Sequence, residues 1–143
     1  MKTKLMILGA IAILTLITGA CSTAIGTPKQ TTIDVSYDEF AQQKNISKEI
    51  AITQGSTLII ELPSNPSTGF SWSKATISDT DVVKQDDSKY VATEGQVVGA
   101  AGQQVWTFAS TGKGTSNITM QYSRPWEGRE KAEWTFEITI IVK

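Results

Sequence analysis

The chain has 143 residues, enough for one domain but too few for two well-filled cores. It contains no histidine and one cysteine, Cys21, which excludes Ser-His-Asp and Cys-His catalysis and a disulfide within the domain, and removes the commonest zinc ligand. A formal net charge of −1 gives no electrostatic basis for binding nucleic acid. We expect a single domain that acts as a monomer, without metal or cofactor.

The first thirty residues predict export. Positive charges on Lys2 and Lys4 precede the apolar run 5–17. This run is short for a membrane span, which needs about 20 residues, and is typical of a signal peptide. We therefore expect a signal peptide over residues 1–20 and a small, polar tether over residues 21–30. The domain itself is expected to occupy residues 31–143.

The end of the apolar run, Thr18-Gly19-Ala20-Cys21, resembles the lipobox of prokaryotic lipoproteins. In such precursors the chain is cut before the cysteine, whose sulfur is acylated. Thr18 departs from the aliphatic residue usual at its position, so cleavage by an ordinary signal peptidase stays an alternative. The resemblance implies an exported domain, anchored by a lipid on Cys21 to the extracytoplasmic side of the prokaryotic cell envelope.

The rest of the chain reads as strands, because β-branched and aromatic residues alternate with polar ones between turn residues. A helical period would scatter Trp134, Phe136 and Ile138 around the axis, so the last run is expected to be one long strand. About eight strands predict an all-β fold, an antiparallel β-sandwich, with residues 45–50 left open as a helical turn. The predicted strand runs lie near residues 33–37, 46–52, 58–62, 70–73, 105–110, 118–122 and 134–142, with two short runs at 82–83 and 90–91 on either side of Asp86 and Asp87.

The carboxylates do not suggest an enzyme. Asp79 and Asp81, like Asp86 and Asp87, lie in a polar stretch without the apolar surroundings that raise a carboxyl pKa. We expect these four residues to form a solvated, charged surface. No catalytic residue and no metal ligand is assigned.

Residues 65–70, which we call the first loop, read as a stiff turn between two strands. Pro66 fixes its own φ, and Gly69 is free to adopt a positive φ. The hydroxyls of Ser67 and Thr68 would then stand at the tip. Taken alone, this stretch is better explained as an ordinary hairpin turn than as a binding loop.

Two further stretches lie outside the strand alternation. Residues 99–102, the middle loop, are small and would let the backbone of a partner come close. Residues 124–126, the last loop, read Arg-Pro-Trp directly after a predicted strand. Trp and Arg are the residue types that most often dominate binding interfaces, although a structural role for Trp126 is an alternative.

Together the three loops resemble the chagasin family of protein inhibitors of papain-like cysteine peptidases. The family motif Asn-Pro-Thr-Thr-Gly-aromatic is matched at residues 65–70 with Ser67 for the first threonine, and Arg-Pro-Trp is matched at residues 124–126. The family's Gly-x-Gly-Gly is met at residues 99–102 except at Ala101, where a glycine is expected. The resemblance covers about residues 31–143.

This resemblance implies an immunoglobulin-like antiparallel β-sandwich with three loops at one end. It also implies that these loops inhibit the peptidase reversibly and non-covalently by occluding its active-site cleft. Thr68 would lie closest to the catalytic thiolate, with the last and middle loops on either wall of the cleft. The peptidase-binding residues that it implies are Asn65, Pro66, Ser67, Thr68, Gly69, Phe70, Gly99, Ala100, Ala101, Gly102, Arg124, Pro125 and Trp126.

The alternative is an immunoglobulin-like surface lipoprotein that binds carbohydrate or envelope components, because tryptophans also stack on sugar rings. Trp72, Trp106 and Trp134 fall within the strand alternation and are assigned mostly to the core. Trp126 is then the one aromatic side chain expected to be exposed, which is little for a sugar-binding surface.

Overall fold

The computed structural model describes residues 29–95, 99–127 and 131–143. The predicted signal peptide, Cys21 and the tether up to residue 28 lie outside the described residues. Within those described ranges, no helix is long and apolar enough to cross a membrane. The first described strand starts at Gln30, and the Thr57 N–H donates to the carbonyl oxygen of Lys29 (3.0 Å).

The described residues form nine strands, one short helix and two single 3-10 turns. They are β1 (Gln30–Asp34), α1 (Tyr37–Gln42), β2 (Asn45–Ile52), β3 (Thr57–Ser64), η1 (Pro66–Thr68), β4 (Ser71–Trp72), β5 (Thr76–Ile77), β6 (Val83–Val91), β7 (Gly102–Ser110), β8 (Gly114–Ser123), η2 (Pro125–Glu127) and β9 (Trp134–Val142).

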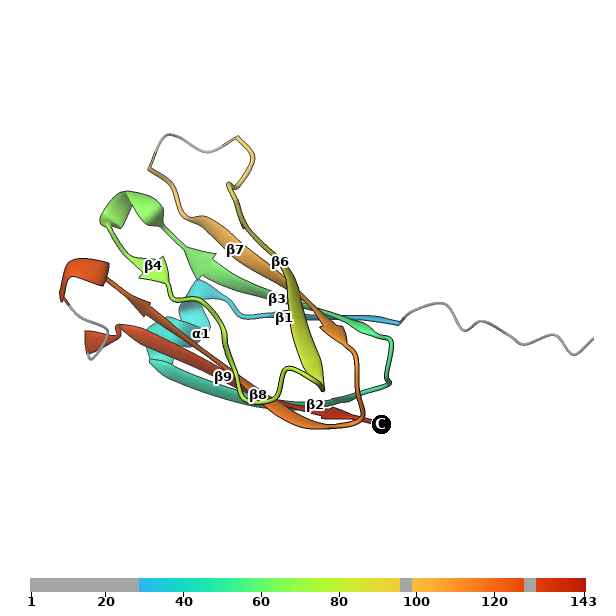
Figure 1. The fold of residues 1–143 in the computed structure, drawn as a ribbon. Helices are drawn as coiled ribbons and strands as arrows, with labels where there is room; N and C mark the ends of the chain where they lie inside the picture. The colour runs from blue at the N-terminus through green and yellow to red at the C-terminus, as the bar shows by residue number, and fades with distance from the viewer. Residues whose placement is uncertain (1–28, 96–98, 128–130) are drawn as a thin grey trace, which may run out of the picture.

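Two sheets face one another as a sandwich (Figure 1). One has the strand order β1-β3-β7-β6, and the other has the order β2-β9-β8-β4, with β5 also paired to β8. The predicted sandwich is confirmed, but its sheets are mixed rather than wholly antiparallel. The edge strand β1 runs parallel to β3, and the edge strand β2 runs parallel to β9. Alternation predicts which face of a strand is buried and not the direction of its neighbour.

The core follows the predicted alternation. Every second side chain of β9, from Trp134 to Val142, is buried, as are those of β8 from Ser116 to Tyr122. Trp106 and Trp134 belong to this core, whereas Trp72 is half-buried against it. The indole N–H of Trp72 donates to the carbonyl oxygen of Pro63 (2.9 Å) at the end of β3.

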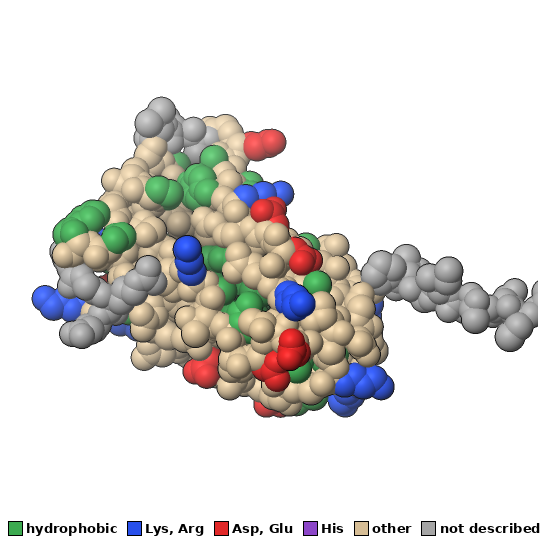
Figure 2. Space-filling view, viewed as in Figure 1, with side chains coloured by type: hydrophobic (Ala, Val, Ile, Leu, Met, Phe, Trp, Pro, Cys, Tyr) green, Lys and Arg blue, Asp and Glu red, His purple; other side chains and the backbone are tan. Residues whose placement is uncertain are grey.

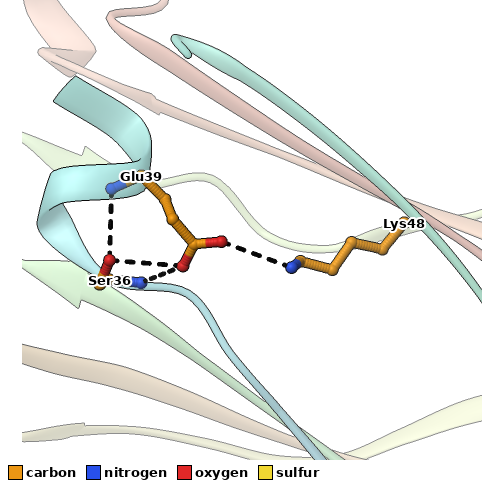
Figure 3. Close-up of polar contacts among 3 residues, drawn as sticks. All are labelled: Ser36, Glu39 and Lys48. Atoms are coloured by element: carbon orange, nitrogen blue, oxygen red, sulfur yellow. Dashed lines mark hydrogen bonds and ion pairs between the residues drawn. The ribbon is translucent and has the colours of Figure 1, made fainter. Parts of the chain in front are cut away.

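The helix α1 was not predicted: Tyr37 was expected in a strand, and residues 45–50, left open as a helical turn, belong to β2. A capping box explains where α1 begins, because the hydroxyl of Ser36 accepts from the Glu39 N–H (3.2 Å) and the Ser36 N–H donates to the Glu39 carboxylate (2.9 Å) (Figure 3). The hydrogen bond from the Ser36 N–H holds the pKa of the Glu39 carboxyl below its usual value. The Lys48 ammonium, 3.6 Å from the Glu39 carboxylate, acts in the same direction. Phe40 anchors the helix in the core.

Asp86 and Asp87 lie within a single strand, β6, on the free edge of its sheet, and Asp79 and Asp81 are exposed just before that strand. The side chains after Val83 are exposed, and a bulge between Gln85 and Asp87 interrupts the pairing with β7. Asp86 and Asp87 therefore lie on a solvated surface, as expected. Figure 2 shows acidic and basic side chains scattered over the visible face, without a large area of one sign.

Candidate functional site

The three predicted loops project from the same end of the sandwich (Figure 1). The first loop follows β3, the middle loop leads into β7, and the last loop follows β8. Ser64, the last residue of β3, pairs with Gly102, the first residue of β7, which brings the first two loops together. The chain's N-terminal strand β1 begins at the opposite end, where Gln30 pairs with Thr57.

The first loop is a 3-10 turn closed by its own hydrogen bonds. Asn65 caps the turn, because its side-chain oxygen accepts from the Ser67 N–H (3.2 Å). Gly69 ends the turn with φ at +80°, the positive φ that the sequence predicts. Its N–H donates to the carbonyl oxygen of Pro66 (3.1 Å). The conformation is therefore set by the loop's own residues rather than by a partner.

Both hydroxyls at the tip donate back into the loop. The Thr68 hydroxyl donates to the carbonyl oxygen of Asn65 (2.7 Å), which also accepts from the Thr68 N–H (3.2 Å). The Ser67 hydroxyl donates to the side-chain oxygen of Asn65 (2.5 Å). Both residues are nevertheless exposed, so their outer surfaces remain accessible.

Hydrogen bonds tie the first loop to the middle loop. The carbonyl oxygen of Gly99 lies 3.2 Å from the side-chain nitrogen of Asn65 and 3.2 Å from the hydroxyl of Ser67. Gly99 has φ at +95°, so a side chain there would strain the backbone. Ala101 is exposed and Ala100 is half-buried.

Gly102 differs from the rest of its motif because it is buried at the start of β7. A Cβ at this position would overlap the carbonyl oxygen of Val91 and lie 2.5 Å from the Tyr90 hydroxyl. The close approach of β6 is thus sufficient to require glycine there, whatever the loop binds.

The last loop lies against the first through Trp126. The Trp126 indole covers Gly69 so closely that a Cβ there would overlap its Cη2 atom and lie 3.1 Å from Cζ2. The rest of Trp126 remains accessible, with 69% of the residue exposed. Figure 2 shows hydrophobic side chains exposed at this end of the molecule, and others over the middle of the visible face. Glycine is therefore needed at residue 69 both for its positive φ and for space.

A column of stacked rings supports the loops from below. The Arg124 guanidinium lies 4.5 Å from the ring centre of Phe70, which stacks on Tyr122 (5.4 Å). Tyr122 in turn stacks on Trp134 (4.8 Å). The Tyr122 hydroxyl also accepts from the Asn65 N–H (2.9 Å), so the column holds the base of the first loop. The strand alternation predicts that Tyr122 is buried, but it does not predict that Tyr122 supports the first loop.

A hollow of about 360 Å³ opens at the base of the loops. Tyr37 of α1 lies on its wall with 60% of the residue exposed and its ring edge-on to Trp134 (5.3 Å). Trp126 is therefore not the one exposed aromatic residue, and Tyr90 is partly exposed as well. Of the described residues, no three His, Cys, Asp or Glu side chains come together as a metal site would need.

The sequence matches a family model, described as Chagasin family peptidase inhibitor I42, over residues 51–140. Chagasin of Trypanosoma cruzi is 29% identical over 82 residues, which cover 55% of this chain and 74% of that protein. Amoebiasin-2 of Entamoeba histolytica is 29% identical over 84 residues, covering 59% of this chain and 68% of that protein.

Solved structures share the fold at lower identity. The cysteine protease inhibitor EhICP2 of Entamoeba histolytica superposes with a TM-score of 0.60 at 18% identity, covering 82% of this chain and 99% of that one. PbICP-C, solved in complex with falcipain-2, superposes with a TM-score of 0.56 at 17% identity, covering 80% of this chain and 99% of that one. The predicted β-sandwich is thus confirmed by its structural neighbours.

Proposed function

The chain belongs to the chagasin family of peptidase inhibitors, and we propose that it inhibits papain-like cysteine peptidases reversibly by filling their active-site cleft with three loops. Membership makes it an inhibitor and not an enzyme. The observation that carries the proposal is the joining of the three loops into one surface. Residues of the first loop hydrogen-bond to Gly99, and Trp126 lies on Gly69.

Internal hydrogen bonds explain how the first loop would resist cleavage. A peptidase must bring the scissile carbonyl into its oxyanion hole, where donors stabilise the developing negative charge. The carbonyl oxygen of Asn65 already accepts two hydrogen bonds, and that of Pro66 accepts one, all from within the loop. Presenting either carbonyl for attack would require the turn to open. A closed turn therefore occludes the cleft without becoming a substrate.

The same bonds favour affinity. A loop that is ordered before docking loses little conformational entropy on binding, so more of its contact energy appears as affinity. Trp126 adds a large exposed ring system whose six-membered ring already lies close to Gly69. Rigid aromatic anchors of this kind dominate many interfaces.

The test is the residual activity of papain on a fluorogenic peptide as the purified protein is added, with trypsin as the control peptidase. We expect a dose-dependent loss of papain activity that dilution reverses, and no loss of trypsin activity. The protein recovered from the mixture should be intact. Full papain activity at micromolar inhibitor would overturn the proposal, and recovery of a cleaved first loop would overturn the occlusion mechanism.

We also propose that Cys21 carries the lipid anchor predicted by Thr18-Gly19-Ala20-Cys21. The start of β1 at the end opposite the loops supports this arrangement, because a tether there would leave the loops pointing away from the membrane. Labelling of the expressed protein with a radioactive fatty acid tests it. The wild-type protein should carry label and Cys21→Ser should not, whereas an unlabelled wild-type protein would favour ordinary signal-peptidase cleavage.

A further inference from the structure

The first loop uses its hydrogen-bond donors internally. The backbone N–H groups of Ser67, Thr68 and Gly69 donate within the loop, and that of Asn65 donates to a tyrosine beneath it. Pro66 has no N–H group. No backbone N–H between residues 65 and 69 is therefore left for a partner.

The two hydroxyls follow the same pattern. A hydroxyl has one proton to donate and two lone pairs that accept. The protons of Ser67 and Thr68 go to oxygen atoms of Asn65, at 2.5 and 2.7 Å. The exposed tip therefore presents oxygen lone pairs and no spare hydroxyl proton. The side-chain donor left over is the second amide proton of Asn65, which belongs to a half-buried residue.

This distribution decides what the tip can bind. Resting on the proposed function, we propose that the Thr68 hydroxyl accepts a hydrogen bond from the protonated catalytic histidine of the peptidase and donates none to the catalytic thiolate. In a cysteine–histidine pair the thiolate is an acceptor only, whereas both nitrogens of an imidazolium donate. Oxygen lone pairs are attracted to the imidazolium and repelled by the sulfur anion. The tip of the first loop therefore binds the histidine of the pair and not the cysteine.

Two features keep the hydroxyl proton where it is. The Thr68 hydroxyl and the Thr68 N–H share one acceptor, the carbonyl oxygen of Asn65, so turning the hydroxyl outward would remove one of the two bonds that close the turn. Ser67 is constrained likewise, because its hydroxyl lies near two acceptors, the Asn65 side-chain oxygen and the Gly99 carbonyl oxygen. A donor turned toward the peptidase would cost an internal hydrogen bond.

A double-mutant cycle tests the pairing. The purified protein, Thr68→Val and Thr68→Ser are titrated calorimetrically into three forms of papain: wild type, catalytic cysteine to alanine, and catalytic histidine to alanine. Thr68→Val keeps the shape of the side chain without its hydroxyl, and Thr68→Ser is the matched control that keeps it. The titrations are run at about pH 5, where a histidine of ordinary pKa near 6.5 is protonated even without the thiolate.

We expect Thr68→Val to raise Kd by about tenfold or more for wild-type papain and for the cysteine variant, as loss of a charge-assisted hydrogen bond does. For the histidine variant the same substitution should change Kd less than threefold. Thr68→Ser should bind all three forms within about threefold of the unsubstituted protein.

Three results would overturn the proposal. One is an equal loss on Thr68→Val for the histidine variant, which would mean that the hydroxyl acts only by closing the turn. Another is a loss of the Thr68→Val effect in the cysteine variant, which would mean that the hydroxyl faces the thiolate. No binding to wild-type papain would overturn the proposed function itself, and this inference with it.

Discussion

Two turns at opposite ends of the sandwich each contain a glycine with almost the same positive φ, but the surroundings of the two glycines differ. Gly55, between β2 and β3, has φ at +82°, and Gly69 in the first loop has φ at +80°. A Cβ on Gly55 would meet no atom within 4 Å, whereas a Cβ on Gly69 would overlap Trp126. Positive φ explains glycine at both positions, and only the second position also binds a neighbouring loop.

Each turn also has a polar residue at its centre. At the Gly55 turn the buried hydroxyl of Ser110 accepts from the Ser56 N–H (2.9 Å) and lies 2.9 Å from the carbonyl oxygen of Thr53. In the first loop the side chain of Asn65 plays the same part, because its oxygen accepts from the Ser67 N–H. Its side-chain nitrogen also donates to the carbonyl oxygen of Gly99 in the middle loop. Dense hydrogen bonding therefore does not by itself identify a binding loop. The first loop differs from the Gly55 turn in its contact with a neighbouring loop and with an exposed aromatic ring.

The largest effect is expected at the exposed ring. Trp126→Ala should weaken inhibition of papain by about 2 kcal/mol or more, about thirtyfold in Ki, because aromatic anchors carry much of an interface's energy. The melting temperature should stay the same, since most of the residue is exposed. Tyr37→Ala, which removes another exposed aromatic residue outside the three loops, is the control. An equal loss of inhibition in both variants would show that Trp126 contributes no more to binding than Tyr37 does.

The two glycines form a matched pair. Gly55→Ala and Gly69→Ala should each lower the free energy of unfolding by about 1 kcal/mol, because each forces a side chain to adopt positive φ. Only Gly69→Ala should weaken inhibition, by about tenfold, since its methyl group displaces Trp126. Chemical denaturation and Ki measurements separate the two effects. Similar Ki values for both variants would show that the Trp126 contact is unimportant for binding.

The far turn should affect stability alone. Ser110→Ala removes the buried hydroxyl that accepts from the Ser56 N–H and donates to the turn, while the Ser56 N–H keeps the carbonyl oxygen of Thr53 as an acceptor (3.1 Å). We expect a loss of about 1 kcal/mol in unfolding free energy. The Ki for papain should be unchanged, because the loops lie at the other end. A weakened inhibitor would mean that the two ends are coupled through the sheets.

The smallest effect is expected where the first and middle loops meet. Asn65→Asp keeps the side-chain acceptor for the Ser67 N–H but replaces the donor to Gly99 by an oxygen. We expect Ki to rise about threefold, the loss of roughly one neutral hydrogen bond's net contribution. Ki should rise further in Asn65→Ala, because this substitution also removes the side-chain oxygen that caps the turn. No change in Asn65→Asp would show that the middle loop binds independently of the first.

Local features of this structure were predictable from the sequence, and contacts between distant segments were not. The alternation in residues 134–142 predicts β9, and the Pro66 and Gly69 pattern predicts a turn with positive φ, because both depend on neighbouring residues alone. The sequence Ser36-Tyr37-Asp38-Glu39 carries a capping-box signal that would have indicated α1. This signal is overlooked when Tyr37 is assigned to the end of the strand alternation that precedes it.

The contact of Trp126 with Gly69 joins residues 57 positions apart, and no periodicity encodes it. The same holds for the parallel edges, because alternation is identical in parallel and antiparallel strands. Gly102 is a case in which a sequence motif overstates function. Its place in the motif suggested a binding role, but the packing of β6 already requires glycine at this position.

The parallel pairing of β1 with β3 determines how the domain bears mechanical load. Gln30 and the loops lie at opposite ends, so a pull between the N-terminus and a peptidase held by the loops is directed along β1. Sliding β1 past β3 loads all the hydrogen bonds of the ladder together, whereas peeling a strand sideways breaks them one after another. With the anchor and the peptidase placed as we propose, the domain would resist tension along the line between them.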